Sequence, residues 1–485
     1  MKAPVAFIAG VGTLGGFAPW SWWSLAILGP AFLLWLWRDA SPRTAARYGF
    51  LFGLGLFGAG ISWVYVSLHD FGGMPAPLAG LTVLLLVAYL ALFPALAGWM
   101  QARWFAGSPA RIVLVAPVLW VLMEWLRGWL FTGFPWLWLG YSQSDTLLAA
   151  YAPLVGVPGI SLWVMMTAGA LAAVLHKPRG RLPWLAVVAA IWGGGWWLDR
   201  VEWTVSEGGA RSVTLVQQNV ALRDKWSAPH QPRIIGAYVD ATLAANTDLV
   251  VWPEAAVPRY LDELPRDVLE TLRAGRADVV FGVIERQDGI PPRSYNSVVA
   301  VTDDGESLYR KQHLVPFGEF LPLRPVLGWL LTVLHIPMSD FDRFEGAQAP
   351  LRAAGVELGI SVCYEDAFPG DVRMTLPRAQ ALLNVSEDAW FGDSLAPHQR
   401  LQMARLRARE TGRDLLRAAN TGPSAVISHR GAVTARTPQF TPAVLSATFQ
   451  PRAGATPYVR FGDWPVLLLC VILVALGAVI GKRET

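Results

Sequence analysis

Three residues whose types suit acyl transfer each follow a short β-rich run in the second half of the chain. They are Glu254 in Trp-Pro-Glu-Ala-Ala, Lys311 in Tyr-Arg-Lys-Gln-His and Cys363 in Ser-Val-Cys-Tyr-Glu. A cysteine is nucleophilic as its thiolate, so it needs a nearby base or cation. Glu254 could take the thiol proton and return it to a leaving group, and Lys311 could stabilise the oxyanion of a tetrahedral intermediate.

Each of these residues alone indicates little. A cysteine after a strand is usually a small core residue, and a lone glutamate or lysine is usually solvated. His313, close to Lys311, could be mistaken for a catalytic imidazole, but structural support is the better interpretation. The hypothesis therefore depends on the three residues occurring together, each just past a strand, where they could meet at one edge of a sheet.

The segment that must position them, roughly 200–460, has the pattern of a layered α/β domain. Short β-branched runs such as 212–216 and 279–283 alternate with helical stretches such as 233–245 and 397–416. This alternation predicts an α/β or α+β domain of ordinary size.

The chain as a whole has the composition of a membrane protein. Of the 485 residues, 53% are apolar and only 16% are charged, whereas soluble proteins carry about 25% charged residues. Many of the 24 tryptophans lie near the ends of apolar runs, as in aromatic belts. We expect eight membrane spans, the first one uncleaved, near residues 4–20, 22–37, 49–67, 77–100, 112–132, 151–175, 183–199 and 462–481.

The loops between these runs predict the orientation. Basic residues follow every second span: Arg38, Arg43 and Arg47; Arg103 and Arg111; Lys177, Arg179 and Arg181; Lys482 and Arg483. The loop after the third span, 67–75, has neither Lys nor Arg. The positive-inside rule then puts both termini in the cytoplasm and the segment 200–460 on the periplasmic side. We expect transmembrane helices in 1–199, a catalytic domain in 200–460 and a last helix in 461–485.

Other signals have simpler interpretations. Gly53 to Gly58 formally matches a dinucleotide fingerprint, but it lies in an expected span, where small-residue helix packing explains it better. Glu124 and Arg127, three residues apart in another span, should pair with each other or face a substrate cavity. The apolar run 325–337 is either a buried helix or an arm on the bilayer surface.

Some classes of function are not favoured. The two cysteines, Cys363 and Cys470, form no CxxC or His/Cys cluster that would hold a metal, and Cys470 lies inside the last apolar run. No Lys/Arg-rich block is interleaved with aromatic residues as in nucleic-acid surfaces. We expect a monomer that needs no metal or diffusible cofactor and binds no nucleic acid.

Longer segments around the three residues resemble the nitrilase (carbon–nitrogen hydrolase) superfamily. They read Trp-Pro-Glu, Tyr-Arg-Lys-x-His-Leu-x-Pro-Phe-Gly-Glu and Val-Cys-Tyr-Glu. With membrane spans on both sides, the resemblance narrows to the apolipoprotein N-acyltransferase family and covers nearly the whole chain. It includes the segments 124–128, 132–136, 216–219, 384–386 and 388–393.

The resemblance implies an αββα sandwich in which Glu254 is the general base, Lys311 the oxyanion stabiliser and Cys363 the nucleophile. Glu319 would be the second glutamate, which positions the other three. Residues near the substrate would be Trp226, Tyr364 and Glu365. Gln218 and Glu387 stand where relatives often have other polar residues.

The activity implied is transfer of a fatty acyl chain from a membrane phospholipid to Cys363, and then to the α-amino group of the N-terminal diacylglyceryl-cysteine of apolipoproteins. This is the last step of bacterial lipoprotein maturation, and the expected location is the inner membrane. A membrane-tethered amidase or nitrilase with a small periplasmic substrate would share the three residues. A scaffold or transporter with a degenerate α/β domain is the other alternative, and the intact residues count against it.

Overall fold

The computed structural model describes residues 2–105, 110–176, 182–321 and 340–482, and its contacts divide the chain into two units. Unit 1 comprises Met1–Tyr65, Pro75–Glu202 and Arg460–Thr485, and unit 2 comprises Val66–Met74 and Trp203–Val459. The segment Val66–Met74, which lies between the third and fourth expected spans, therefore packs as part of the unit that holds the α/β domain. The apolar run 326–336 lies outside the described residues.

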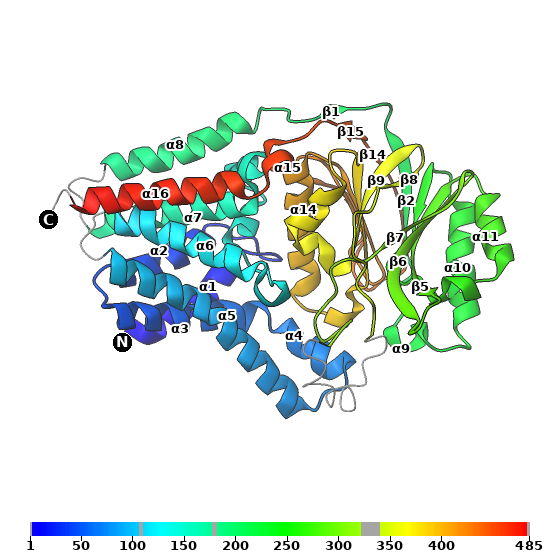
Figure 1. Ribbon diagram of the computed structural model, residues 1–485, viewed down its shortest axis with the longest axis horizontal. Coiled ribbons are helices and arrows are strands. Elements are labelled where there is room, and N and C mark those ends of the chain that lie inside the picture. The colour runs from blue at the N-terminus through cyan, green and yellow to red at the C-terminus, as the bar shows by residue number, and fades with distance from the viewer. Residues whose placement is uncertain (1, 106–109, 177–181, 322–339, 483–485) are drawn as a thin grey trace. The chain divides into compact units, whose positions relative to one another are not determined.

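Unit 1 is helical, and its long helices run side by side (Figure 1). They are α1 (Lys2–Leu14), α2 (Leu25–Trp37), α3 (Pro42–Gly60), α5 (Ala76–Trp104), α6 (Ala116–Arg127), α7 (Ala152–His176), α8 (Leu182–Leu198) and α16 (Trp464–Lys482). The short α4 (Trp63–Val66) leads into the segment Val66–Met74.

The expected number of eight spans is not confirmed. Among the described residues, two helices are long and apolar enough to cross a membrane, Ala76–Trp104 and Leu147–Leu175, and a third if Pro42–Gly60 and Trp63–Phe71, bent by 50°, form one span. The other apolar helices are shorter: Lys2–Leu14, Leu25–Trp37, Leu182–Leu198 and Trp464–Ala478. The difference arises because apolar composition continues through the turns that end these helices, and a 13-residue helix such as α1 reaches only about 20 Å.

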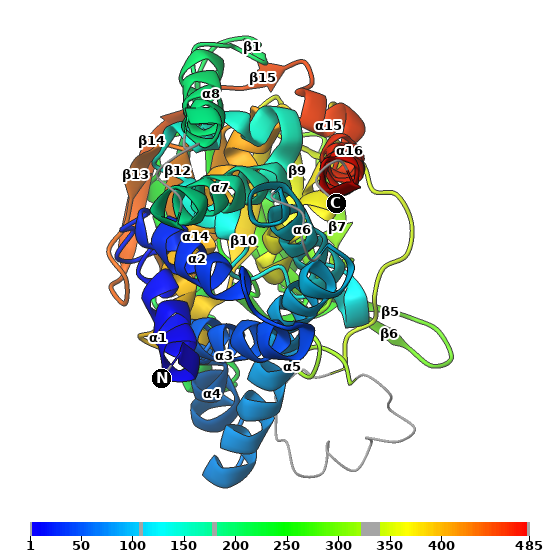
Figure 2. The same cartoon turned by 90° about the vertical axis from the view of Figure 1, so that its left-hand side faces the viewer.

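The glycines of α3 confirm the helix-packing interpretation of Gly53 to Gly58. A Cβ on Gly55 would lie 2.2 Å from the carbonyl oxygen of Phe7 in α1, and a Cβ on Gly53 would lie 2.7 Å from the Cα of Ala91 in α5. Helix α3 thus touches two neighbours through backbone that only glycine exposes (Figure 2).

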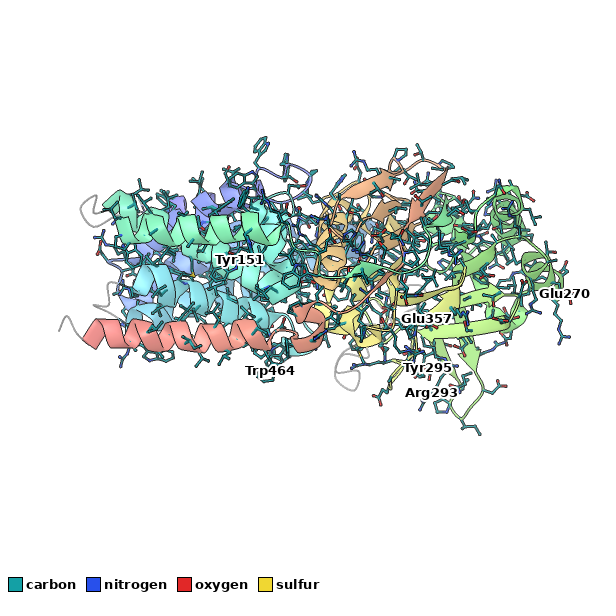
Figure 3. The ribbon with its side chains drawn as sticks, turned by 90° about the horizontal axis from the view of Figure 1, so that it is seen from above. Tyr151, Glu270, Arg293, Tyr295, Glu357 and Trp464 are labelled. Carbon is teal, nitrogen blue, oxygen red and sulfur yellow. The ribbon has the colours of Figure 1, made fainter. Side chains whose placement is uncertain are left out.

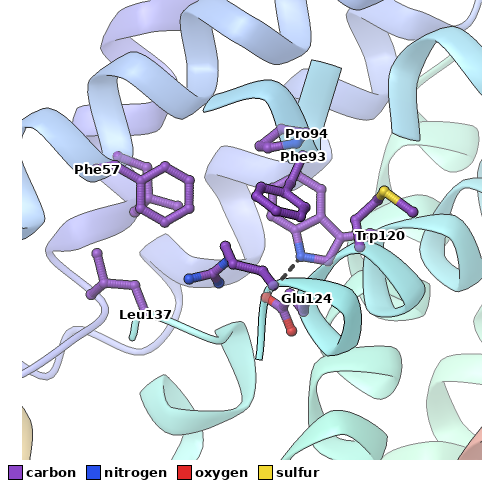
Figure 4. Close-up of a pocket in the computed structure, with 9 residues that line it drawn as sticks. Phe57, Phe93, Pro94, Trp120, Glu124 and Leu137 are labelled. Atoms are coloured by element: carbon purple, nitrogen blue, oxygen red, sulfur yellow. Dashed lines mark hydrogen bonds between the residues drawn. The ribbon is translucent and has the colours of Figure 1, made fainter. Parts of the chain in front are cut away.

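Glu124 and Arg127 of α6 line a small, mostly apolar pocket of unit 1 and hold irregular backbone beside it. Glu124 Oε1 accepts a hydrogen bond from Trp120 Nε1 at 2.9 Å (Figure 4). It also accepts one from the backbone N–H of Leu139 at 2.9 Å. Arg127 Nη1 donates to the carbonyl oxygens of Phe134 (2.8 Å) and Trp136 (2.6 Å). Both charged groups therefore bond to the irregular backbone that follows α6, which offsets the cost of placing them in an apolar environment.

Within the described residues, unit 2 contains a seven-stranded and a six-stranded mixed sheet. The first has the order β14-β2-β3-β5-β6-β7, with β4 beside β5; the strands are β2 (Arg211–Gln217), β3 (Leu249–Val251), β4 (Val257–Tyr260), β5 (Asp278–Gln287), β6 (Arg293–Thr302), β7 (Gly305–Arg310) and β14 (Ala443–Phe449). The second has the order β13-β12-β11-β10-β9-β8; the strands are β8 (Leu351–Ala353), β9 (Val356–Val362), β10 (Ala381–Ser386), β11 (Leu415–Ala419), β12 (Ala425–Ile427) and β13 (Val433–Arg436). A separate short pair joins β1 (Val205–Ser206) to β15 (Arg452–Ala453).

The two sheets pack face to face and are covered by helices on their outer faces. The helices of unit 2 are α9 (Leu222–Lys225), α10 (Gln231–Ala244), α11 (Arg266–Arg273), α13 (Pro369–Val372) and α14 (Ala396–Thr411), and α15 (Pro457–Phe461) begins in it. One apolar core joins the inner faces, with Leu215 and Val251 against Ile360 and Leu383. Helices α10 and α11 cover the seven-stranded sheet, and α14 covers the six-stranded sheet. The result is a four-layer αββα arrangement.

Helix amphipathicity explains the outer layers. In α11, Leu272 is buried against the sheet, while Glu270 points away from it (Figure 3). The inner strands β9 and β10 are buried on both faces and pair in parallel, as nearly continuous apolar runs should. Because β9, β10 and β11 run parallel, the residues that follow them gather at one edge of the sheet.

Candidate active site

Cys363 lies at that edge, directly after β9, in a backbone conformation that its surroundings hold. Its φ is +50°, a left-handed value that costs a non-glycine residue about 1–3 kcal/mol and persists only where neighbours enforce it. Its carbonyl oxygen accepts hydrogen bonds from Arg400 Nη2 (2.6 Å) and from Asn384 Nδ2 (3.3 Å). The thiol is buried.

The structure brings Glu254, Lys311 and Glu319 together with Asn296, and we call these four residues the base cluster. Lys311 Nζ lies 2.8 Å from Glu319 Oε1 and 3.8 Å from Glu254 Oε1. Asn296 Nδ2 donates to Glu254 Oε1 (2.7 Å) and to Glu319 Oε1 (3.0 Å). Asn296 was not identified from the sequence, although a polar Ser-Tyr-Asn-Ser run inside the buried strand β6 could have indicated it.

Electrostatics around the sulfur favour a neutral thiol. Burial, and then the negative charge of Glu254, raise the pKa of Cys363 to about 12, against the opposing effects of Arg400 and Lys311. Burial alone would lower the pKa of Lys311, but the carboxylates of Glu319 and Glu254 raise it above its usual value. The cysteine therefore needs its proton removed as it attacks, and Lys311 keeps its charge throughout.

The buried ion pair of Lys225 and Glu387 also holds Glu254 in place. The backbone N–H of Glu387 donates to Glu254 Oε2 (2.8 Å), and Lys225 Nζ donates to the carbonyl oxygen of Glu254 (3.0 Å). Lys225 and Glu387 also bond directly to each other, and Asn420 Nδ2 donates to both oxygens of Glu387 at 3.0 Å. Burial raises the pKa of Glu387, and Lys225 opposes that rise. The sequence had marked Glu387 as unusual but had not identified Lys225.

The residues expected near the substrate differ in their surroundings. Glu365 is buried and accepts hydrogen bonds from Tyr309 Oη and from the backbone N–H groups of Gln312, His313 and Val362, at 2.7–3.1 Å. It thus joins the chain after Lys311 to the strand end before Cys363, an arrangement that suits positioning. Burial raises the pKa of Glu365 to about 6.

Trp226 and Tyr364 are both half-buried. Tyr364 packs edge-on against Phe368, with ring centroids 4.8 Å apart. His313 stacks on Phe368 at 3.6 Å, and its Nδ1 lies 2.9 Å from Asp371 Oδ2. These contacts favour the interpretation of His313 as structural support.

A second set of buried charges, which the sequence did not indicate, lies on the six-stranded sheet and α14. It consists of Asp366, Asp388, Arg400 and Arg417, each at most 1% exposed, and we call it the arginine cluster. Arg400 bonds to Asp366 (3.0 Å) and Asp388 (2.7 Å). Arg417 bonds to the same two carboxylates at 3.3 and 2.5 Å.

The segment Val66–Met74 contacts the chain just after β10. Ser67 Oγ donates to the carbonyl oxygen of Trp390 (2.8 Å), and the ring of Phe71 meets the ring of Trp390 edge-on at 6.4 Å. Because Trp390 lies three residues beyond Glu387, this segment buttresses the loop whose backbone holds Glu254.

The arrangement supplies what acyl transfer through a cysteine requires: a thiol, a carboxylate that can take its proton and an ammonium beside them. Among the described residues, no group of three or more His, Cys, Asp or Glu side chains is placed to hold a metal ion.

Comparison with known proteins identifies the family of both parts of the chain. Residues 9–170 match the apolipoprotein N-acyltransferase N-terminal domain, and residues 212–458 match the carbon-nitrogen hydrolase domain. An apolipoprotein N-acyltransferase of Nitrosomonas europaea is 45% identical over 99% of this chain and 98% of its own length. One from Methylococcus capsulatus is 45% identical over 98% and 96%, respectively. Since the likeness covers both domains from end to end, the chain belongs to the apolipoprotein N-acyltransferase family.

Proposed function

We propose that this N-acyltransferase takes a fatty acyl chain from a membrane phospholipid, carries it as a thioester on Cys363, and delivers it to the α-amino group of the N-terminal diacylglyceryl-cysteine of an apolipoprotein. The observation that carries the proposal is the buried group of Glu254, Lys311 and Cys363, in a chain whose relatives are named for N-acylation of apolipoproteins.

In the first step, the Cys363 S–H proton passes to Glu254 while the sulfur attacks the ester carbonyl of the phospholipid. Lys311 balances the negative charge of the tetrahedral oxyanion. Collapse breaks the ester C–O bond, and Glu254 returns its proton to the departing lysophospholipid oxygen. Glu319 and Asn296 hold the side chains of Lys311 and Glu254 in position for both proton transfers.

In the second step, the neutral α-amine attacks the thioester carbonyl. Glu254 accepts the proton that the new amide nitrogen loses, and breakage of the C–S bond expels the Cys363 thiolate. Transfer of that proton to the sulfur restores the starting thiol. Trp226 and Tyr364, which are both half-buried, are our candidates for contacts with the lipid substrates.

Both substrates are lipids, which accounts for apolar helices in the same chain as the catalytic fold. Leu81, Leu84 and Leu85 of α5 are exposed, as expected of side chains that face acyl chains. We place the protein in the inner membrane, with both termini cytoplasmic and the catalytic unit periplasmic. A reporter active only in the periplasm should work when fused near Asp224 and fail when fused after Lys482; the reverse would overturn the orientation.

The activity is tested with purified protein, phospholipid and a synthetic diacylglyceryl-cysteine peptide. Mass spectrometry should show one fatty acyl group added to the peptide amine by the natural chain, and none by Cys363→Ala or Cys363→Ser. Release of free fatty acid with no acylated peptide would favour the membrane-tethered hydrolase. Undiminished transfer by either variant would remove Cys363 from the reaction.

A further inference from the structure

Arg400 of α14 places its guanidinium directly against the sulfur of Cys363. Nη1 lies 3.5 Å from Sγ, and Nη2 donates to the carbonyl oxygen of the same residue at 2.6 Å. Nη1 also contacts Ser386 Oγ, which itself lies 3.8 Å from Sγ. Arg400 therefore contacts both the sulfur and the backbone carbonyl oxygen of Cys363 through one charged side chain.

The rest of the arginine cluster explains how a guanidinium can be buried there. Asp388 Oδ1 accepts from Nη1 (2.7 Å) and Asp366 Oδ1 accepts from Nη2 (3.0 Å), so both ends of the fork are held by carboxylates. Such pairing offsets the large cost of burying a charge and fixes the orientation of the fork. Burial lowers the pKa of Arg400, but Asp366 and the neighbouring acids raise it well above its usual value. The charge beside the sulfur is permanent.

The two cations around Cys363 lie in different surroundings. Lys311 is bound to the carboxylates of the base cluster, and its proposed partner is the carbonyl oxygen of the acyl group. Arg400 contacts the sulfur itself, and its positive charge opposes the rise in the pKa of Cys363 that burial and Glu254 cause. Sulfur carries negative charge as it attacks the ester and again as it leaves the thioester, so a fixed donor there lowers both barriers.

We propose that Arg400 is a catalytic residue that donates a hydrogen bond to the Cys363 sulfur and stabilises the thiolate in both steps. The assignment of the two steps rests on the proposed function, but the effect on the sulfur does not. The competing role is purely structural: Arg400 would hold the left-handed backbone of Cys363 through its carbonyl oxygen and have no influence on the charge of the sulfur.

Alkylation of Cys363 by iodoacetamide separates these roles, because the reagent reports the thiolate fraction and needs no phospholipid. The rate is followed at the Cys363 peptide as a function of pH. We expect Arg400→Gln to shift the profile to higher pH and slow alkylation at neutral pH about tenfold, the equivalent of one pKa unit. Arg400→Lys, which keeps the charge but loses the fork, should slow it by less, about threefold.

The matched control is Arg407→Gln, which removes another fully buried arginine of α14, one that pairs with Glu410 at 2.7 Å. It should lower the melting temperature and leave the alkylation profile unchanged. If Arg400→Gln does not fold, the Lys variant decides: a wild-type profile would overturn the proposal. Failure of both Arg400 variants to fold, while Arg407→Gln folds, would assign Arg400 a structural role only and would also overturn it. The alkylation experiment contains no acyl donor, so its result does not depend on the proposed function. Absence of transferase activity in the natural chain would contradict the proposed function but would leave the conclusion about Arg400 and the sulfur unchanged.

Discussion

Cys363 lies between two buried charge clusters that differ in composition. The base cluster sets two carboxylates, Glu254 and Glu319, against one ammonium, whereas the arginine cluster sets two carboxylates against two guanidinium groups. A cluster with excess negative charge can accept a proton; a balanced one whose cations never deprotonate cannot. The difference indicates that proton transfer belongs to the first cluster and fixed charge to the second.

The two clusters have opposite effects on the pKa of the Cys363 thiol. Glu254 raises the pKa of Cys363 and Arg400 lowers it, so variants on the two sides should move its titration in opposite directions. The following variants test this contrast, from the largest expected effect to the smallest.

Glu254→Gln should reduce acylation of Cys363 by about 10²–10⁴-fold, because an amide cannot accept the thiol proton. The same change removes a negative charge beside the sulfur, so the alkylation profile should move to lower pH. Adduct formation with excess phospholipid and iodoacetamide alkylation measure the two effects. Normal acylation by this variant would mean that another group is the base.

Lys311→Met should reduce transfer by about 10²–10³-fold, as loss of an oxyanion donor does. It should also move the alkylation profile to higher pH, since the ammonium lowers the pKa of Cys363. Steady-state kinetics should show the loss mainly in kcat. A change confined to KM would assign Lys311 to substrate binding instead.

Lys225→Met and Glu387→Gln should each lower kcat about tenfold, because each leaves a buried charge without its partner and loosens Glu254. Removing both should cost no more than the worse single change, since the pair acts as a unit. Additive losses would show that the two residues act separately. Arg273→Met with Glu306→Gln, which break an exposed pair, should leave kcat unchanged.

Glu365→Gln tests stability. The pKa of Glu365 in the fold, about 6, is above its ordinary 4.5, so the folded state binds the proton more tightly than the unfolded state. Its ionisation therefore costs the fold about 2 kcal/mol as pH rises through that window. The variant cannot titrate at this position, so the unfolding free energy of the natural chain, measured relative to that of the variant, should fall by about 2 kcal/mol as pH rises through this interval. A constant difference would contradict the assigned pKa.

Those parts of the site that follow strands were open to prediction. Glu254, Lys311 and Cys363 come just after β-rich runs, so their places at strand ends follow from local pattern. The expectation that they share one edge of one sheet was wrong, because Glu254 and Lys311 follow β3 and β7 of the seven-stranded sheet and Cys363 follows β9 of the six-stranded sheet. Their meeting depends on the packing of the two sheets, which no local pattern reports. The layered α/β character follows from the alternation of strands and helical stretches, whereas the four-layer αββα order was implied only by the resemblance to the nitrilase superfamily.

The arginine cluster was not predictable for a physical reason. The sequence of α14, with His398, Arg400, Arg405, Arg407 and Arg409, has the composition of a solvated helix. Its burial depends on Asp366 and Asp388, which reach it from the ends of β9 and β10, and no local pattern reports such pairing. Asn296 and Lys225 could not be predicted for the same reason, since each acts on Glu254 through contacts with residues distant in sequence.

The expected eight spans are not confirmed, because composition does not reveal where a helix ends and four of the apolar runs form helices of only 10–17 described residues. The packing of Val66–Met74 on Trp390 could not be predicted either, because its contacts, among them a hydrogen bond from Ser67 and a ring contact of Phe71, join residues more than 300 positions apart in the chain.

Intact-mass analysis of the purified protein after incubation with phospholipid alone tests the central claim, that Cys363 carries the acyl group by virtue of a base on one side and a fixed cation on the other. The natural chain should gain the mass of one fatty acyl group, which hydroxylamine removes as it does a thioester. Cys363→Ala should gain nothing, and Glu254→Gln should gain it far more slowly. An adduct of equal yield on Cys363→Ala, or one that resists hydroxylamine, would contradict the account.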